Sequence, residues 1–522
     1  MGVIVGRSRV ATRYGIVAAS QPLAARAGVQ MLERGGNAVD AAIAANAVLG
    51  VVEPQSNGIG GDLFAIVYEA KSGTLHGLNA SGWSPRALTP ALLKSRGVHE
   101  MPRSGIHSVP LADLLAPAIA YAAEGFPVSD VIAAHWGSLA DTLAAERDAA
   151  RTYLPGGRPP RAGEIFRNGD LAASLSAIAR DGAGAMYEGS IADAILAASR
   201  ARGGAMTKDD LREFAPEWVA PISTTYHGWT VHELPPNTQG LAALLMLDLM
   251  EQFPLADYGF HTTRALHVMI EAKKLAYADM LRHVGDPRFG AAPMAALLSK
   301  SAAKARAARI DPRRAAADVR PSSLAGLTTS VGADTIYLCA IDKDGNIASL
   351  IQSIYEGFGT SIVPPGTGFA LHNRGALFTL ETNHPNVLAP RKRPLHTIIP
   401  AFMQKDGVRI GFGIMGGFNQ AQAHAQFVSN VADFGMDIQQ ALEAGRFTKP
   451  TFTGADVFVE ALVPEPVRAE LAALGHDVVT VPPRTGTFGH GQAVMDDDRG
   501  VHFGASEPRH DGAAIPEAPP LR

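Results

Sequence analysis

Cysteine is nearly absent from this chain of 522 residues, which contains only Cys339. An internal disulfide is therefore impossible, and no cluster of thiols is available to bind zinc. Cys339 lies in an apolar stretch, where we expect a small buried side chain rather than a reactive thiol. The scarcity of cysteine favours a cytoplasmic protein.

Charge and long apolar runs are also limited. Charged residues make up 18% of the chain, and the net charge of −4 does not favour nucleic acid or an anionic membrane surface as a partner. The longest apolar stretches, 41–52 and 241–250, are too short to span a bilayer and are predicted to be core helices. The N-terminus has no continuous apolar run behind a basic start, so we expect no secretory signal.

Patterns typical of metal ligands are missing as well. The 17 histidines include no HExxH motif or comparable spacing, so we predict neither a metal nor another cofactor. Hydrophobic residues account for 47% of the chain, which is enough to bury a substantial core.

The first half of the chain is predicted to be mostly helical, and strand-like patterns dominate after a change in composition. Residues 309–334 are rich in Pro, Arg, Ala, Ser and Gly without a sustained period, which predicts an exposed linker. Helices are expected at 21–34, 38–52, 111–124, 128–147, 170–180, 191–202, 239–252, 262–282, 294–308, 419–434, 438–445 and 464–474. Strands are expected at 64–68, 74–78, 335–341, 347–355, 368–371, 398–404 and 408–414. This order indicates an α+β layered sandwich.

The most informative segment, 333–355, is predicted to form a β-hairpin. Its turn, Asp-Lys-Asp-Gly-Asn, suits a three-residue loop with Gly345 in the left-handed region. Pairing across this turn places Thr335 opposite Ser353, where a loose polar segment meets a sheet. A cut there would expose an N-terminal threonine nucleophile. The alternative is an ordinary Thr–Ser cross-strand pair without a chemical role.

A glycine-rich loop, 411–417, runs from a predicted strand into a predicted helix and matches the pattern G-x-G-x-x-G. Three interpretations remain open from the residues alone. The loop could bind a dinucleotide pyrophosphate in a non-catalytic protein. The backbone N–H groups of Gly416 and Gly417 could instead face a developing oxyanion, or the glycines could serve only a tight turn.

Several blocks of sequence together resemble the γ-glutamyltransferase family, and the likeness covers nearly the whole chain. In order, these blocks are ERGGNAVDAA at 33–42, GIGG at 58–61, LLAPAI at 114–119, EGFPVS at 124–129, DKDGN at 342–346, FGT at 358–360, KRPL at 392–395, GG at 416–417 and PRHDGAAI at 508–515.

This resemblance implies an Ntn-hydrolase αββα four-layer sandwich, made as a proenzyme that cuts itself. The cut would fall between Asp334 and Thr335, giving a large fragment, 1–334, and a small fragment, 335–522, that stay together as a heterodimer. Thr335 would then be the nucleophile and, through its freed α-amine, the general base. Ser353 aligns with the family's second hydroxyl, which holds the nucleophile.

Gly416 and Gly417 align with the family's oxyanion-hole glycines. The implied chemistry is acyl transfer from an amide through a covalent acyl-enzyme, with a small molecule as substrate and no cofactor.

The chain also departs from typical γ-glutamyltransferases at substrate-binding positions. Tyr355 occupies the position of an Asn, and Arg374 and Leu377 replace the Gln and Asp that receive the glutamyl α-amino group. The arginine that binds the glutamyl α-carboxylate aligns with Ser81. A substrate ammonium would therefore lack its counter-charge.

Further substitutions affect the expected lining of the site. His396 and Thr397 replace paired serines, and together with Asn373 they are candidates for contact with substrate. Relatives also have an additional loop and helix where Pro110 here runs directly into Leu111. The absence of that element predicts an altered cleft wall or altered maturation.

Arg374 offers a planar fork suited to a carboxylate, and its alternative role is a surface salt bridge. These substitutions resemble a cytoplasmic branch of the family that includes oxamate amidohydrolase. We therefore predict hydrolysis of a small carboxylate-bearing amide such as oxamate. The enzymatic alternative is a γ-glutamyl hydrolase or transferase acting on glutathione and γ-glutamyl amides.

Overall fold

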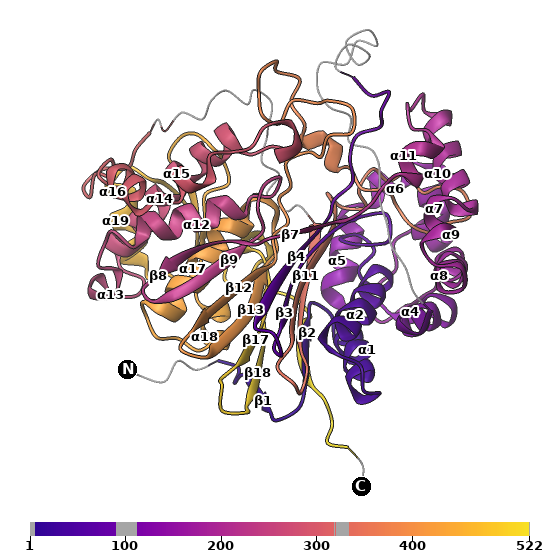
Figure 1. Ribbon diagram of the computed structural model, residues 1–522, viewed down its shortest axis with the longest axis horizontal. Coiled ribbons are helices and arrows are strands. Elements are labelled where there is room, and N and C mark those ends of the chain that lie inside the picture. Colours follow the sequence, from indigo (N-terminus) through magenta and orange to yellow (C-terminus); the bar gives the residue numbers. More distant parts are fainter. Residues whose placement is uncertain (1–5, 90–111, 318, 320–333, 521–522) are drawn as a thin grey trace.

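The computed structural model describes residues 6–89, 112–317, 319 and 334–520. Two antiparallel seven-stranded sheets pack face to face between two layers of helices (Figure 1). The predicted α+β sandwich with αββα layers is therefore confirmed. Within the described ranges, no helix combines the length and the hydropathy that a bilayer crossing requires.

Both sheets draw strands from distant parts of the chain. In spatial order, the first sheet contains β1 (Val10–Thr12), β18 (His502–Ser506), β17 (Gly491–Asp496), β13 (Val408–Ile414), β12 (Ala401–Lys405), β9 (Trp229–Glu233) and β8 (Ile222–Tyr226). The second contains β19 (Ala513–Pro516), β2 (Ile16–Ala19), β10 (Asp334–Ile341), β11 (Ile347–Tyr355), β3 (Asp62–Glu69), β4 (Thr74–Ala80) and β7 (Glu217–Val219). Two small sheets lie outside this sandwich: β14 (Phe447–Thr448), β15 (Asp456–Glu460) and β16 (Asp477–Val481), and β5 (Phe126–Pro127) with β6 (Ile165–Phe166).

Each helical layer belongs to one side of the sandwich (Figure 1). The layer beside the second sheet contains α1 (Pro22–Glu33), α2 (Ala38–Val52), α4 (Ala112–Glu124), α5 (Asp130–Ser138), α6 (Ala140–Ala144), α7 (Arg147–Tyr153), α8 (Gly169–Asp181), α9 (Ala183–Tyr187), α10 (Ser190–Ala201) and α11 (Lys208–Arg212). The opposite layer contains α12 (Gly240–Met250), α13 (Leu255–Tyr258), α14 (Thr263–His283), α15 (Met294–Leu297), α16 (Lys300–Ala307), α17 (Gln420–Ala432), α18 (Ile438–Glu443) and α19 (Glu465–Ala473).

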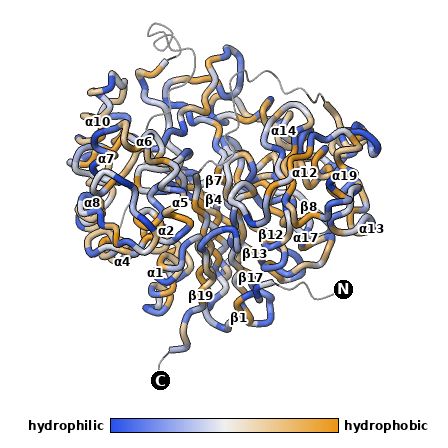
Figure 2. The backbone as a smooth tube through the Cα atoms, turned by 180° about the vertical axis from the view of Figure 1, so that it is seen from behind, coloured by the Kyte–Doolittle hydropathy of each residue, from blue (hydrophilic) through white to orange (hydrophobic). Residues whose placement is uncertain are grey.

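Strand β10 shows how the sequence builds these layers. Its side chains alternate: Leu338 and Ala340 belong to the core under the helices, whereas Tyr337, Cys339 and Ile341 belong to the core between the sheets. Period-two alternation of apolar residues on both faces is typical of a strand with no solvent-exposed face. Figure 2 shows the result, with hydrophobic segments gathered along the sheets and hydrophilic segments in outer loops.

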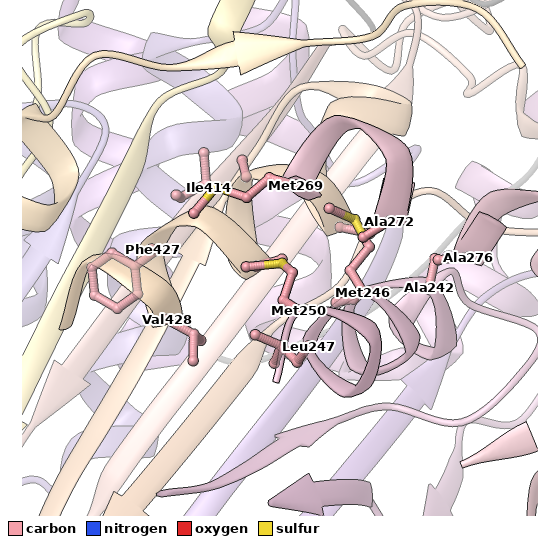
Figure 3. Close-up of a cluster of buried hydrophobic side chains, with 14 of the residues drawn as sticks. Ala242, Met246, Leu247, Met250, Met269, Ala272, Ala276, Ile414, Phe427 and Val428 are labelled. Carbon is pink, nitrogen blue, oxygen red and sulfur yellow. The ribbon is translucent and has the colours of Figure 1, made fainter. Parts of the chain in front are cut away.

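The third apolar core lies between the first sheet and the helices of the opposite layer. Met246 and Met250 of α12, Met269 of α14 and Phe427 of α17 meet above β13 (Figure 3). Every residue of α12 is buried and all but Asp248 are apolar, so this helix lies in the interior of the protein.

The predicted hairpin at 333–355 is confirmed for its described part. Strands β10 and β11 pair from Ile341↔Ile347 outward, and the turn closes through a hydrogen bond from the N–H of Gly345 to the C=O of Asp342 (3.1 Å). Gly345 has φ +82°, as its predicted left-handed conformation requires. The Asp342 carboxylate also accepts from the N–H of Ala38 (3.0 Å), which docks the turn against the start of α2.

Several local predictions are wrong. The helix predicted at 128–147 is broken into shorter helices, because Leu139 (ψ 7°) and Glu146 (ψ 120°) leave the helical region. The strand predicted at 368–371 is absent, since Gly368 at φ +74° interrupts the extended backbone. The short strands β2, β8 and β9 were not foreseen in the first half of the chain.

The predicted linker 309–334 is described only in part, and within that part the prediction is only half right. Arg309 and 311–314 are exposed, but Ile310 and Ala315 are buried, and the N–H of Ala315 donates to the C=O of Leu474 (2.7 Å). The altered junction at 110–111 lies outside the described residues.

Candidate active site

The two hydroxyls singled out by the sequence meet at one end of the second sheet. The Thr335 hydroxyl, at the start of β10, donates to Oγ of Ser353, near the end of β11, over 3.2 Å. Both residues are at most 1% exposed. The register shifts by one residue between Asp334 and Ile336, so Thr335 sits at a β-bulge rather than in a regular pair. Bulges of this kind aim a side chain away from the regular pleat.

The backbone next to Ser353 holds its hydroxyl from the other side. The N–H of Tyr355 donates to Oγ of Ser353 over 2.8 Å. Tyr355 has φ +80°, an uncommon conformation for a residue with a β-carbon. The Ser353 oxygen is thus fixed between Thr335 and the start of the loop that follows β11.

Gly416 and Gly417 reach the same end of the molecule from the other sheet. A β-carbon on Gly411 would touch Ile347 and Ser349, and one on Gly413 would touch Tyr337. Successive residues of β13 therefore advance along the hairpin toward Thr335. The loop after β13 consequently lies at the level of the hydroxyl pair.

The conformation of this loop leaves two N–H groups available. Gly416 (φ +128°) and Gly417 (φ +58°) both adopt backbone conformations that favour glycine. The C=O of Gly416 accepts from the N–H of Asn419 (3.0 Å), so the N–H of Gly417 points the opposite way across the planar peptide. Among the described residues, no hydrogen bond from the N–H of Gly416 or Gly417 is found.

Arg374 is buried rather than on the surface, so the surface salt bridge considered from the sequence is wrong. Its Nε donates to Oδ2 of Asp62 (3.2 Å) and its Nη1 donates to the Thr397 hydroxyl (2.6 Å). Its Cζ lies 4.5 Å from the ring centre of Tyr355, which links the guanidinium to the residue beside Ser353. Nη2 is buried and has no hydrogen-bond partner among the described residues.

Asp62 is the centre of a buried charge cluster. Its Oδ2 lies 3.2 Å from Nε2 of His396 and 3.6 Å from Nδ1 of His372, besides its contact with Arg374. Its Oδ1 accepts from the N–H of Gly82 (3.1 Å). All four side chains of the cluster are almost fully buried. A carboxylate with these partners has little capacity left for another cation.

The protonation states in this cluster follow from burial and from Arg374. Burial alone would raise the pKa of Asp62, but His372, His396 and Arg374 outweigh burial and hold that pKa far below its usual range. Burial lowers the pKa of His372 to about 4 and also lowers the pKa of His396. Asp62 and Arg374 therefore form an ion pair beside two imidazoles that are neutral near pH 7.

The other predicted lining residues are placed as follows. The Oδ1 of Asn373 accepts from the N–H of Glu356 (3.1 Å) and its Nδ2 donates to the Glu356 carboxylate (3.0 Å), so Asn373 supports the loop after β11. His396 and Thr397 each contact the Asp62–Arg374 pair directly. The structure thus brings Tyr355, His396 and Thr397 together around Arg374, whereas Asn373 contacts Glu356.

Asp62 and His372 also belong to this cluster, although neither was predicted from the sequence. Asp62 directly follows the glycine pair of the 58–61 block and begins a strand with mostly apolar residues. A carboxylate at the start of a buried strand requires a buried cation, and that requirement was the available signal. His372 carried no comparable signal, because a single histidine in a loop is most often unrelated to chemistry.

One cluster of described residues has atoms spaced for a metal: His267, Glu271 and His476. Two nitrogens on a tetrahedral zinc ion would be about 3.3 Å apart. Nδ1 of His267 and Nε2 of His476 are only 2.8 Å apart and form a hydrogen bond. Nζ of Lys274 lies 2.7 Å from Oε1 of Glu271 and already supplies the positive charge. We assign no metal to this cluster.

The buried His372 predicts a loss of stability in mild acid. Its pKa falls from 6.5 to about 4 on folding, so the folded protein resists a proton that the unfolded chain accepts. The stability that this difference provides is complete above about pH 6.5 and is lost as the pH falls toward 4. With about 1.4 kcal/mol for each pKa unit, His372 accounts for roughly 3 kcal/mol.

We expect His372→Asn, whose Oδ1 can replace Nδ1 of His372 as the acceptor for the N–H of Arg374, to lose less stability on acidification than the parent protein. Denaturant unfolding at pH 7 and pH 5 measures this difference. Equal losses in the two proteins would contradict the assignment.

Comparison with known proteins gives matches along nearly the entire chain. Residues 24–517 match the gamma-glutamyltranspeptidase family. The chain is 35% identical to the glutathione hydrolase-like YwrD proenzyme of Bacillus subtilis, over 98% of this chain and 100% of that protein. It is 31% identical to the oxamate amidohydrolase proenzyme of Klebsiella pneumoniae, over 97% of this chain and 99% of that protein. The crystal structure of a cephalosporin acylase from Bacillus halodurans has a TM-score of 0.90 and 40% identity, covering 99% of this chain and 98% of that one.

Proposed function

This chain belongs to the gamma-glutamyltranspeptidase family of hydrolase and transferase enzymes, and we propose that it is an autoprocessing amidohydrolase for small amides that carry a carboxylate. In this proposal the chain cuts itself between Asp334 and Thr335. Thr335 then attacks the substrate amide. The names of the two curated relatives, both called proenzymes, support maturation by cleavage.

The two fragments would remain together because both sheets are built from both of them. In the second sheet, β10 from the small fragment pairs with β2 from the large fragment, and β11 pairs with β3. In the first sheet, β12 pairs with β9 in the same way. Separating the fragments would break all of these ladders, so the mature protein is proposed to be a heterodimer.

The chemistry proposed for the cut protein is acyl transfer. The α-amine of Thr335, with a reference pKa of about 7.7–8.0, takes the proton from Oγ1 as that oxygen bonds to the amide carbon. The carbonyl oxygen becomes an oxyanion facing the N–H groups of Gly416 and Gly417. The C–N bond then breaks, the departing amine receives the proton, and an ester on Thr335 remains. A water molecule attacks that ester by the same route and releases the acid.

Ser353 has a positioning role in this scheme. Its oxygen accepts the Thr335 hydroxyl and the N–H of Tyr355, so it fixes the direction of the nucleophile before the cut and after it. Proper orientation of a nucleophile is among the larger contributions to enzymatic rate.

The observation that carries the substrate proposal is the unpartnered Nη2 of Arg374. Asp62 and Thr397 hold the other two guanidinium nitrogens, so the orientation of Nη2 is set before any ligand arrives. A buried donor on a cation is best satisfied by a carboxylate oxygen. The relative named oxamate amidohydrolase acts on an amide of this kind, which supports oxamate as the substrate class here.

A γ-glutamyl substrate is less well matched by the same residues. Its α-ammonium would require a free carboxylate, but both oxygens of Asp62 already contact protein donors. Leaving a substrate ammonium without a counter-charge in a buried site is costly. Because one relative is named glutathione hydrolase-like, action on γ-glutamyl amides is the alternative outcome of the experiment below.

Three amides separate these possibilities. We expect kcat/KM for oxamate, followed by ammonia release, to exceed that for oxamide, which has the same size without the charge, and that for a γ-glutamyl anilide, followed by its chromophore. A preference for the anilide would contradict the substrate proposal while leaving the amidase chemistry intact.

A further inference from the structure

Gln239 joins the support of Arg374 to the glycine loop. It precedes α12, comes from the proposed large fragment and is completely buried. Its Nε2 donates to two carbonyl oxygens, that of Gly417 (2.8 Å) and that of Thr397. One side-chain amide therefore ties together two loops that lie on the proposed small fragment.

The first of these loops carries the contact to Arg374. The hydroxyl of Thr397 accepts from Nη1 of Arg374 (2.6 Å), while the carbonyl of the same residue accepts from Gln239. The backbone also pairs here, since the N–H of Gln239 donates to the C=O of His396 (3.0 Å) and the N–H of His396 donates to the C=O of Asn237 (2.8 Å). A displacement of Arg374 would therefore be transmitted to Gln239 through one residue, Thr397.

The second loop is the one proposed to bind the oxyanion. The peptide before Gly417 is fixed by the N–H of Asn419, and the peptide after it is fixed by Gln239 and by the N–H of Gln420. The next carbonyl, that of Phe418, accepts from the hydroxyl of Tyr277. The orientations of both peptide planes that flank Gly417 are therefore fixed. The side chain of Gln239 helps to fix the plane that follows Gly417.

We propose that Gln239 is a positioning residue that holds Gly417 for oxyanion binding and couples it to the carboxylate site at Arg374. This inference rests on the proposed function, because it uses the roles given there to Gly417 and Arg374. Binding energy from a remote part of a substrate raises kcat when it is used to orient the reacting centre. The carboxylate of a substrate therefore increases kcat through Gln239 and does not act on KM alone.

The test uses Gln239→Glu, which keeps the shape of the side chain but cannot donate to two carbonyl oxygens. Gln239→Leu, which lacks both polar atoms, is the second variant. Gln252→Glu is the matched control, because Gln252 is a partly buried glutamine just beyond the other end of α12 whose Nε2 donates to a single carbonyl (3.2 Å). Activity is expressed per mole of cut protein, measured by mass spectrometry.

We expect kcat for oxamate to fall about 100-fold in Gln239→Glu, the scale on which a misplaced oxyanion donor acts, with KM within threefold of the parent value. The ratio of kcat for oxamate to kcat for oxamide should fall toward one in both Gln239 variants and stay unchanged in Gln252→Glu. If one Gln239 variant yields no cut protein, the other supplies the comparison.

Two results would overturn the inference. A lowered melting temperature with kcat within threefold of the parent value would show that Gln239 only braces the fold. An unchanged oxamate-to-oxamide ratio would show that no coupling passes through it. A parent protein inactive on every amide would overturn the proposed function and this inference with it, which distinguishes that failure from failure of the inference alone.

Discussion

Thr335→Ala should leave the protein as one continuous chain and abolish amide hydrolysis. In the proposed mechanism, the hydroxyl that attacks its own peptide bond is then gone, and no covalent intermediate can form with the substrate. We expect a loss of roughly 10⁴-fold or more in kcat, the scale seen when an enzyme loses its covalent nucleophile. Electrophoresis and intact mass report the cut, and ammonia release reports the activity.

Ser349→Ala is the matched control for Thr335→Ala. Ser349 belongs to the same hairpin and its hydroxyl is hydrogen-bonded to that of Tyr337 (2.7 Å) inside the core. This variant removes a buried hydroxyl contact of the same kind without touching the proposed nucleophile. It should still be cut and active. Cleavage at 334–335 in Thr335→Ala would contradict the assignment of the nucleophile.

Arg374→Gln should remove the preference for a carboxylate. Truncating one partner of a buried charged contact costs about 2–5 kcal/mol, so kcat/KM for oxamate should fall about 100-fold or more. The neutral oxamide gains nothing from the guanidinium, and its kcat/KM should change far less. The measured quantity is the oxamate-to-oxamide ratio in the parent protein and in the variant.

Arg374→Gln should also lower the stability of the protein, because Asp62 loses its permanent counter-charge. Breaking a buried ion pair from one side costs about 3–5 kcal/mol of stability. The double variant Asp62→Asn/Arg374→Gln removes both charges and should recover much of that stability. It should still show no preference for oxamate over oxamide. Asp62→Asn alone leaves the guanidinium uncompensated, so KM for oxamate should decrease. A ratio unaffected by Arg374→Gln would contradict the carboxylate site.

The hairpin was predictable because its information is local. The turn at 342–346 has the residues its geometry demands, and alternation in β10 and β11 sets the register. Only the bulge at Thr335 was not foreseen, since one extra residue in a strand leaves no trace in apolar spacing. The glycine loop was also located, but its dinucleotide-binding interpretation fails because β13 pairs antiparallel with both neighbours.

The environment of Arg374 was not predictable from sequence alone. Its partner Asp62 lies 312 positions away, and the pair meets only because β3 lies beside β11, whose end leads into the Arg374 loop. Gln239 was not predicted for the same reason, since it contacts Gly417 across 178 positions of sequence. Side-chain contacts of this range are set by the order of strands in the sheets. Short strands such as β2 and β9 carry too few residues to reveal that order.

The most direct test of the account is the intact mass of the purified, active protein. We expect two polypeptides that stay associated under native conditions, one ending at Asp334 and the other beginning at Thr335, with activity proportional to the cut fraction. A single continuous polypeptide with full amidase activity would contradict it.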